Sequence, residues 1–178
     1  LQVLELSQIP IHRDERGEDV PIIAAGGPSV FNPFPLADFI DVFLSGEFDF
    51  EMKNFADIIY NLKKNGAKRD DILKELSKLE YAYVPKYKKE NVKRIFVENI
   101  NEMPYVKKPL VPLVEGIQNR ISVEIARGCT HSCRFCLAGI TYRPVRNRTI
   151  EKIVDIAMES LEATGANTLN LFSLSADD

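Results

Sequence analysis

The chain has 178 residues, of which 45% are hydrophobic and 28% are charged, a composition typical of globular proteins. Its formal net charge of −3 at pH 7 argues against a protein that binds nucleic acid through a generally basic surface. The sequence has no apolar run of about 18 residues and no basic-then-apolar leader, so we expect neither a membrane span nor a signal peptide. Three clustered cysteines are a poor disulfide framework, which favours the reducing cytoplasm.

A short apolar run at 20–25 is typical of a buried parallel strand, and 41–44 is predicted to be the next strand. Pro35, between them, suits the start of a short helix. Gly26 and Gly27 follow the run at 20–25. Glycines there can let the backbone approach a bound cofactor or nucleotide, although a tight turn is the interpretation that we prefer.

Periodic hydrophobic residues predict two amphipathic helices next, over 51–66 and 69–80, and Gly66 suits the C-cap of the first. Alternating strands and helices predict a doubly wound α/β domain over 1–90, of the Rossmann or flavodoxin type. We expect the buried helix faces to consist of Met52, Phe55, Ile58, Ile59 and Leu62, followed by Ile72, Leu73, Leu76 and Leu79.

The segment 91–120 is predicted to be a linker. A basic stretch at 86–94 overlaps its start and is interpreted as a solvated linker or hairpin, and a short strand is expected at 94–97. Three prolines then favour an extended connection, namely Pro104, Pro109 and Pro112.

The last third of the chain, 121–178, predicts a β–α–β unit. Its strands are expected at 121–129 and 168–175, and its helix between an N-cap at Thr149 and a C-cap at Gly165. The predicted buried stripe of this helix is Ile150, Ile153, Val154, Ala157 and Leu161.

All three cysteines of the chain lie directly after the first of these strands with the spacing C-x3-C-x2-C, as Cys129, Cys133 and Cys136. Parallel α/β sheets and barrels build their sites at this end of a strand. Three thiolates suit an iron–sulfur cluster with one iron open to a ligand other than protein. His131 would instead complete a Cys₃His zinc site, and the third alternative is that the cysteines are incidental.

Six arginines surround the cysteines, and Glu124 is the only acidic residue among them. Guanidinium groups stabilise an anionic cluster and hold carboxylates of small ligands, a role for which Arg143 is our candidate. A contact with phosphate or RNA is the rival use. The six are Arg120, Arg127, Arg134, Arg143, Arg146 and Arg148.

The segment CTHSCRFC, from Cys129 to Cys136, has an aromatic residue before its last cysteine and resembles the radical S-adenosylmethionine (radical SAM) enzymes. The resemblance implies a 4Fe–4S cluster held by the three cysteines, with S-adenosylmethionine on the remaining iron. Reduction then gives a 5′-deoxyadenosyl radical. Phe135 would lie near the adenine, and 121–178 would open a partial TIM barrel.

The segment GGPSVFNPFPLADFIDVFLSGE resembles the cobalamin-binding-type domain that precedes many radical SAM domains, and the chain from about Pro21 to its end resembles an uncharacterised subgroup with that arrangement. Two departures bear on cofactors. Where many radical SAM proteins carry Gly-Gly-Glu, this chain has Ser173, Ser175 and Asp177 as candidates to hold the ligand's amino group. The stretch DERGED lacks the cobalt-binding histidine, and His12 lies outside the pattern, so cobalamin is a possible cofactor without a histidine ligand.

The sequence therefore predicts part of a radical SAM enzyme that receives electrons from a carrier such as flavodoxin or ferredoxin. The start at Leu1 and the end after an apolar run indicate a piece of a longer protein, inactive by itself and prone to self-association through an unfinished sheet. The alternative is an α/β module that binds a nucleotide, RNA or a protein partner, with zinc or nothing at the cysteines.

Overall fold

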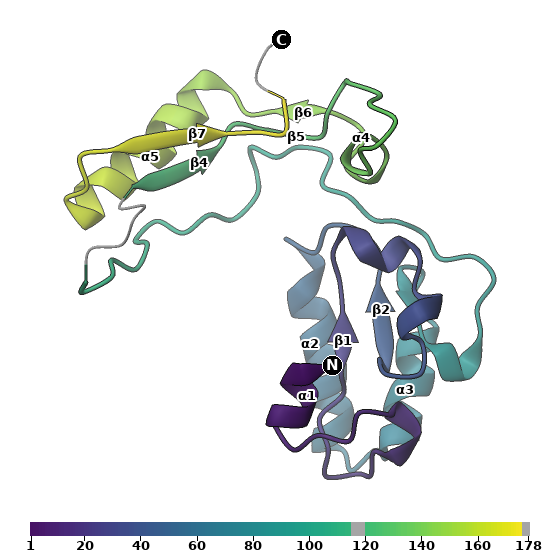
Figure 1. Cartoon of the computed structure of the whole chain (residues 1–178). Coiled ribbons are helices and arrows are strands. Elements are labelled where there is room, and N and C mark those ends of the chain that lie inside the picture. Colours follow the sequence, from purple (N-terminus) through teal and green to yellow (C-terminus); the bar gives the residue numbers. More distant parts are fainter. Residues whose placement is uncertain (115–119, 176–178) are drawn as a thin grey trace. The chain divides into compact units, whose positions relative to one another are not determined.

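The computed structural model describes residues 1–114 and 120–175. The chain divides into two compact units, unit 1 (Leu1–Phe96) and unit 2 (Val97–Asp178). Both units combine helices with short strands, which confirms the predicted α/β class (Figure 1). No helix in the described part is both long enough and apolar enough to cross a membrane.

Unit 1 is built around a three-stranded sheet in the order β1–β2–β3. β1 pairs with β2 in parallel, and β3 pairs with β2 in antiparallel orientation. The elements in chain order are α1 (Gln2–Leu6), the 3-10 helix η1 (Arg13–Glu15), β1 (Ala24–Ala25), η2 (Pro28–Phe31), η3 (Phe34–Leu36), β2 (Val42–Leu44), α2 (Glu51–Lys64), α3 (Arg69–Ser77), β3 (Ala82–Tyr83) and η4 (Pro85–Tyr87).

The antiparallel third strand distinguishes unit 1 from the doubly wound domain that we expected. Two helices, α2 and α3, lie between β2 and β3. A single crossover helix returns the chain for a parallel strand, whereas a pair of helices delivers it at the opposite end of the sheet. The described residues therefore form a small mixed sheet, and the doubly wound arrangement is not confirmed.

The strand predicted at 20–25 is shorter than expected, and the short helix predicted at Pro35 is a 3-10 helix. The run at 20–25 contributes only Ala24–Ala25 to the sheet, and Pro35 lies in η3. Pro21 has no N–H to donate to a ladder, and the N–H of Ile23 donates to the carboxylate of Asp41 at 2.8 Å. These two residues therefore limit the strand to the end of the run.

The core of unit 1 lies between the sheet and the two long helices. Phe55 of α2 and Leu76 of α3 are buried against Val42 and Leu44 of β2. The other residues predicted for the two helix faces are at least partly buried, with the exception of Met52, which is 51% exposed. The helical periodicity was thus correct, and only its first position was wrong.

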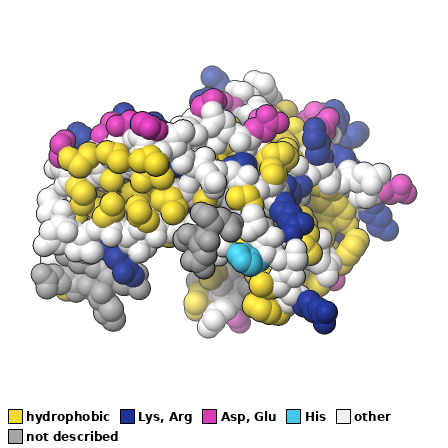
Figure 2. Space-filling model, turned by 90° about the horizontal axis from the view of Figure 1, so that it is seen from above, with side chains coloured by type: hydrophobic (Ala, Val, Ile, Leu, Met, Phe, Trp, Pro, Cys, Tyr) yellow, Lys and Arg dark blue, Asp and Glu magenta, His cyan; other side chains and the backbone are white. Residues whose placement is uncertain are grey.

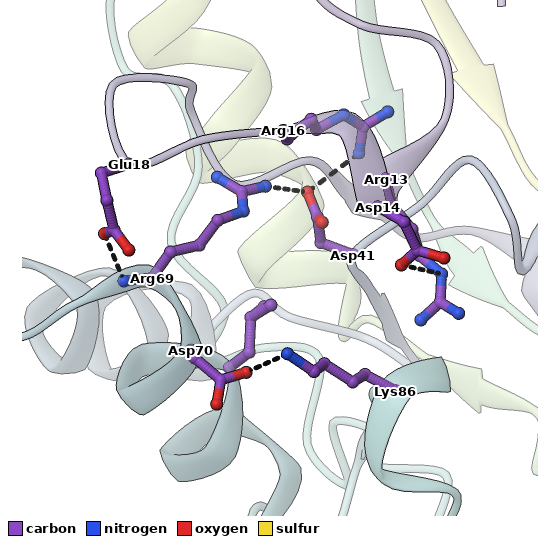
Figure 3. A pocket seen from close by; sticks show the side chains of 9 residues that line it. Arg13, Asp14, Arg16, Glu18, Asp41, Arg69, Asp70 and Lys86 are labelled. Atoms are coloured by element: carbon purple, nitrogen blue, oxygen red, sulfur yellow. Dashed lines mark hydrogen bonds and ion pairs between the residues drawn. The ribbon is translucent and has the colours of Figure 1, made fainter.

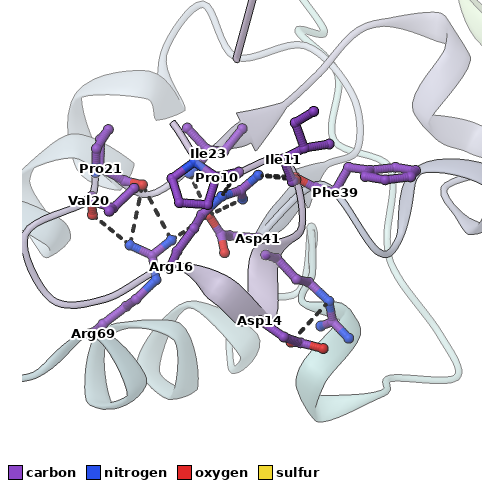
Figure 4. Close-up of polar contacts among 11 residues, drawn as sticks. Pro10, Ile11, Asp14, Arg16, Val20, Pro21, Ile23, Phe39, Asp41 and Arg69 are labelled. Atoms are coloured by element: carbon purple, nitrogen blue, oxygen red, sulfur yellow. Dashed lines mark hydrogen bonds and ion pairs between the residues drawn. The ribbon is translucent and has the colours of Figure 1, made fainter. Parts of the chain in front are cut away.

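One carboxylate organises the loops around β2 (Figure 4). Oδ2 of Asp41, whose side chain is 2% exposed, accepts hydrogen bonds from Arg16 Nη1 at 3.0 Å and from Arg69 Nη2 at 2.6 Å. The side chains of Arg16 and Arg69 are 0% and 10% exposed. Both guanidinium groups also donate to loop carbonyl oxygens, Arg16 to those of Pro10, Ile11 and Phe39 and Arg69 to those of Val20 and Pro21.

We expect Asp41→Asn to destabilise unit 1 strongly, because the substitution leaves two buried guanidinium groups without their shared counter-charge. Removing one partner of a buried ion pair costs about 3–5 kcal/mol, to be measured by urea unfolding. The matched control is Asp57→Asn, which breaks an exposed ion pair with Lys53 on α2 and should change the unfolding free energy by less than about 1 kcal/mol. Equal effects of the two substitutions would contradict a structural role for Asp41.

Unit 2 contains the predicted β–α–β unit. β4 (Ile121–Glu124) and β7 (Leu169–Phe172) pair in parallel, and α5 (Ile150–Thr164) connects them and packs on β4. Between β4 and α5 the chain also forms β5 (Ala126–Arg127), α4 (Ala138–Thr141) and β6 (Arg146–Asn147). The antiparallel pairing of β5 with β6 was not predicted, since each strand has only two residues.

Both predicted caps of α5 are confirmed. Oγ1 of Thr149 accepts a hydrogen bond from the N–H of Lys152 at 3.3 Å, and Gly165 ends the helix with a φ of +68°.

The predicted buried stripe of α5 is confirmed in part. Ala157 is buried and Ile153 packs against the core of unit 2, whereas Ile150 and Val154 are 76% and 52% exposed. The buried face also includes the polar Ser160, which hydrophobicity alone could not indicate.

Large hydrophobic side chains remain exposed on unit 2. Leu171 and Phe172 of β7 are 52% and 46% exposed, and Met158 of α5 is 51% exposed. Figure 2 shows hydrophobic side chains gathered at the molecular surface. A two-stranded sheet covered by one helix leaves part of its apolar surface open, as expected for the first strands of a larger sheet.

Candidate metal centre

The three cysteines lie in the loop that follows β5, at the end of unit 2 where the parallel strands β4 and β7 terminate. All three are free thiols, with Cys133 exposed and Cys129 and Cys136 partly buried. The N–H of Cys136 donates to the carbonyl oxygen of Cys133 at 3.0 Å, which closes a turn between these two residues. The structure therefore places thiols that are not committed to disulfides at the position expected for a site.

Two glycines allow the cysteine loop to pack closely on its surroundings. Gly128 has a φ of +98°, and a Cβ built there would lie 2.7 Å from the carbonyl oxygen of Tyr142 and 2.9 Å from that of Pro144. A Cβ on Gly139, in α4, would lie 2.7 Å from the carbonyl oxygen of His131. Glycine is thus required at both ends of the loop, at Gly128 by backbone conformation as well as by space.

His131 connects the loop to the end of β7. Its Nδ1 lies 3.8 Å from Sγ of Cys129 and 3.3 Å from Oγ of Ser175. The hydroxyl of Ser173 donates to the carbonyl oxygen of Ser175 at 2.8 Å and fixes the same segment. Three candidate site residues from distant parts of unit 2, Cys129, Ser173 and Ser175, are therefore linked in one group.

A cavity of about 270 Å³ lies beside this group. Of the candidate residues, Cys129 and Ser175 line it, together with Gly128, Val145 and Arg148 among others. Phe135 is not among the lining residues and is 92% exposed.

The remaining candidates lie outside this group. Arg143 donates from Nη2 to the hydroxyl of Ser132 at 3.0 Å, within the cysteine loop. Asp177 lies outside the described residues.

Besides Arg143, three further arginines have structural contacts that the sequence did not indicate. Arg127 forms a bidentate ion pair with Glu124, with distances of 3.0 and 2.9 Å. Arg146, 8% exposed, donates to the carbonyl oxygens of Val97 at 2.6 Å and of Pro144 at 2.8 Å.

Arg148 is also 8% exposed and donates to the carbonyl oxygen of Glu124 at 2.9 Å and to that of Ile100. Arg146 and Arg148 thus attach residues 97–100, which we expected to be part of a linker, to the strands around the cysteine loop. A general count of positive charge therefore overstated how many guanidinium groups are available to an anionic cluster.

The candidates in unit 1 are separate from the cysteines along the chain. Gly27 has a φ of +97° and precedes η2, while a Cβ on Gly26 would lie 3.9 Å from the carbonyl oxygen of Leu44. The tight turn accounts for the conformation of Gly27. The ring of His12 packs against Phe39 with a centroid distance of 5.1 Å.

Among residues 1–114 and 120–175, no three cysteine, histidine or acidic side chains converge closely enough to hold a metal ion. The donors nevertheless fit a sulfur-ligated cluster, because three uncommitted thiols lie within eight consecutive residues next to a cavity. Their side chains have to be drawn together when a cluster binds. The exposed position of Cys133 and the short turn to Cys136 leave room for that movement.

Fold and site together define an α/β protein in which a β–α–β unit carries a three-cysteine loop at the end of its parallel strands. Residues 1–85 match the family described as "Radical SAM proteins, N-terminal", which supports a radical SAM-related protein.

The chain is 32% identical over 163 residues to a protein of Methanocaldococcus jannaschii that is described as uncharacterized. That alignment covers 88% of this chain and 32% of the relative, so the chain spans about a third of the length of the curated relative that it matches. No solved structure matches the chain significantly.

We expect Gly128→Ala to disturb the cysteine loop, because the new Cβ would meet two carbonyl oxygens in a left-handed backbone conformation. Gly165→Ala is the matched control, since its φ of +68° is also positive but no atom lies within 4 Å of the added Cβ. The control should lose about 1–2 kcal/mol in urea unfolding, and Gly128→Ala about 1–3 kcal/mol more.

Thiol labelling with a chromogenic disulfide should react faster with Cys129 in the Gly128→Ala variant only. Indistinguishable behaviour of the two variants would show that the close approach at Gly128 is not important.

Proposed function

We propose that Cys129, Cys133 and Cys136 hold a 4Fe–4S cluster and that the protein containing this chain is a radical SAM enzyme. The observation that carries the proposal is the position of three free thiols in one short loop, at the end of parallel strands, in a chain whose first 85 residues match a radical SAM N-terminal family. Three protein ligands leave one iron open for a cofactor, which suits chemistry rather than electron storage alone.

Unit 2 is proposed to begin the parallel barrel of this enzyme. The β4–α5–β7 connection has the parallel pairing that repeats in such barrels, and the exposed side chains of β7 would be covered by the strands and helices that come next. The cysteine loop would then lie at the carboxyl-terminal face, where barrels place their active sites.

The candidate residues in and near the cysteine loop have distinct proposed roles in binding S-adenosylmethionine, and Ser175 is the one of them that lines the cavity. The hydroxyl groups of Ser173 and Ser175 would accept or donate hydrogen bonds to the amino acid part of the cofactor. Arg143 would face its carboxylate after the loop closes, and Phe135, now 92% exposed, would cover the adenine. The cavity of about 270 Å³ is slightly below the usual range of about 300–1,000 Å³ for ligand pockets, so it suits part of this cofactor.

The chemistry that such a cluster would supply when bound is one-electron reduction of the sulfonium of S-adenosylmethionine, with the electron taken from a carrier such as flavodoxin or ferredoxin; breaking the bond between sulfur and C5′ would release methionine and leave a 5′-deoxyadenosyl radical. The protein's part is to hold the sulfonium near the thiol loop and to exclude water from the radical. His131 contacts both Cys129 and Ser175 and would hold the cysteine loop at a fixed position relative to the cofactor-binding serine.

Anaerobic reconstitution with iron and sulfide should give a brown protein with about four irons and four sulfides per chain. Cys129→Ala, Cys133→Ala and Cys136→Ala should each lose most of this iron and the associated visible absorption, because each removes one of three ligands. Ser132→Ala is the control within the same loop and should retain the cluster. Iron retention by all three cysteine variants would refute the assignment.

His131→Ala separates the cluster from the zinc alternative. The cluster proposal expects this variant to retain its iron and to bind no stoichiometric zinc. A Cys₃His site would bind one zinc in the unsubstituted protein and lose it in this variant. Metal analysis of both proteins therefore decides between the two sites.

A further inference from the structure

Unit 1 contains a cavity of about 380 Å³ that belongs to neither the cysteine loop nor the turn at Gly26 and Gly27 (Figure 3). It is lined by charged side chains from η1 and the loop that follows it, from the residue that precedes β2, from the start of α3 and from η4. The lining includes four basic residues, Arg13, Arg16, Arg69 and Lys86. It also includes four acidic residues, Asp14, Glu18, Asp41 and Asp70.

The lining has equal numbers of basic and acidic side chains, but more of the basic ones are buried. The side chains of Arg13, Arg16 and Arg69 are only 18%, 0% and 10% exposed, whereas Asp41 is the one acid in the lining that is buried, at 2%. Asp14 is 82% exposed, and Glu18 is also exposed. Because water screens exposed charges far more than buried ones, the interior of this cavity has an excess of two positive charges.

The third exposed acid in the lining, Asp70, already has a partner. A hydrogen bond from Lys86 lowers the pKa of Asp70, and the side chains of Asp70 and Lys86 are 58% and 53% exposed. Glu18 likewise accepts a hydrogen bond from the backbone N–H of Arg69 at 2.7 Å. Lys86 compensates the charge of Asp70, and the charge of Glu18 is exposed and screened by water, so both carboxylates neutralise the buried guanidinium groups much less than Asp41 does.

One N–H group of Arg13, at Nε, has no hydrogen-bond acceptor among the described residues. This Nε is buried, and the nearest carboxylate oxygen, Oδ1 of Asp14, lies 3.7 Å away. The backbone N–H of Arg13 donates to the carbonyl oxygen of Asp38 at 2.9 Å, which holds this residue in place. Buried polar groups are normally satisfied, so an unsatisfied guanidinium N–H beside a cavity requires an acceptor.

We propose that this cavity binds a phosphoryl group, with Arg13 as its principal ligand. A phosphate monoester carries about −1.5 to −2 charges at pH 7, which matches the excess of two positive charges, whereas a carboxylate supplies only one. The planar donors of arginine suit the oxygens of phosphate, and Arg16 and Arg69 contribute charge while their own hydrogen bonds hold Asp41 and the loop carbonyls.

Isothermal titration calorimetry at low ionic strength tests the proposal with inorganic phosphate as the probe and acetate as the comparison anion. The purified protein should bind phosphate with heat that saturates at one equivalent and should bind acetate at least about tenfold more weakly. Adenosine monophosphate is a second probe: tighter binding than phosphate identifies a nucleotide monoester as the ligand, and equal binding identifies a free phosphoryl group. Absence of phosphate binding to the folded protein overturns the proposal.

Arg13→Met should weaken phosphate binding at least about tenfold, because it removes both the charge and the unused donor. Lys53→Met is the matched control: it removes the same charge from an exposed position of α2, where the side chain is 84% exposed, and should leave the affinity within about twofold. If both substitutions weakened phosphate binding equally, the effect would come from the net charge of the protein, and the proposed site would be wrong.

Asp14→Asn provides a test in the opposite direction. It removes the carboxylate that lies 3.7 Å from Arg13 Nε, so phosphate should bind more tightly to this variant, and unchanged or weaker binding counts against the proposal. Arg13→Lys retains the charge without the guanidinium N–H and replaces Arg13→Met if the latter does not fold. Cys129→Ala, which should lose the cluster, should bind phosphate like the unsubstituted protein, so the two proposals fail separately.

Discussion

Within each unit, hydrogen bonds from buried guanidinium groups to loop carbonyl oxygens stabilise the fold. The strands of this chain have two to four residues, so their ladders satisfy few backbone groups. Arg16 and Arg69 take over this role in unit 1, and Arg146 and Arg148 take it over in unit 2. A guanidinium group has five donors in a fixed plane and can therefore satisfy several carbonyl oxygens that no neighbouring strand reaches.

In each unit a carboxylate accompanies the buried arginines, Asp41 in unit 1 and Glu124 in unit 2. Asp41 compensates two arginines at once, which leaves positive charge in the adjoining cavity. In unit 2, Glu124 pairs with Arg127 at 2.9 Å and lies 4.0 Å from Arg148. The same side-chain type thus builds a polar cavity in one unit and supports a thiol loop in the other.

The sequence predicted the parts that depend on local patterns. Helices α2, α3 and α5 followed from hydrophobic periodicity, and Thr149 and Gly165 were identified as caps because capping depends on a few adjacent residues. The cysteine spacing located the candidate loop for the same reason. Long-range choices were not predictable: the antiparallel direction of β3 depends on how two helices return the chain, and the buried face of α5 includes the polar Ser160. The burial of Arg146, which looked like one of several surface cations, depends on a contact 49 residues away.

The attachment of Val97 and Ile100 to Arg146 and Arg148 determines where the two units can be dissected for separate study. The proline-rich stretch suggests a cut near residue 104 or 120, but such a cut would discard the acceptors of two buried arginines along with the hydrophobic cluster of Val97, Ile100 and Met103. An expression boundary that preserves the cysteine-bearing half must begin before Val97.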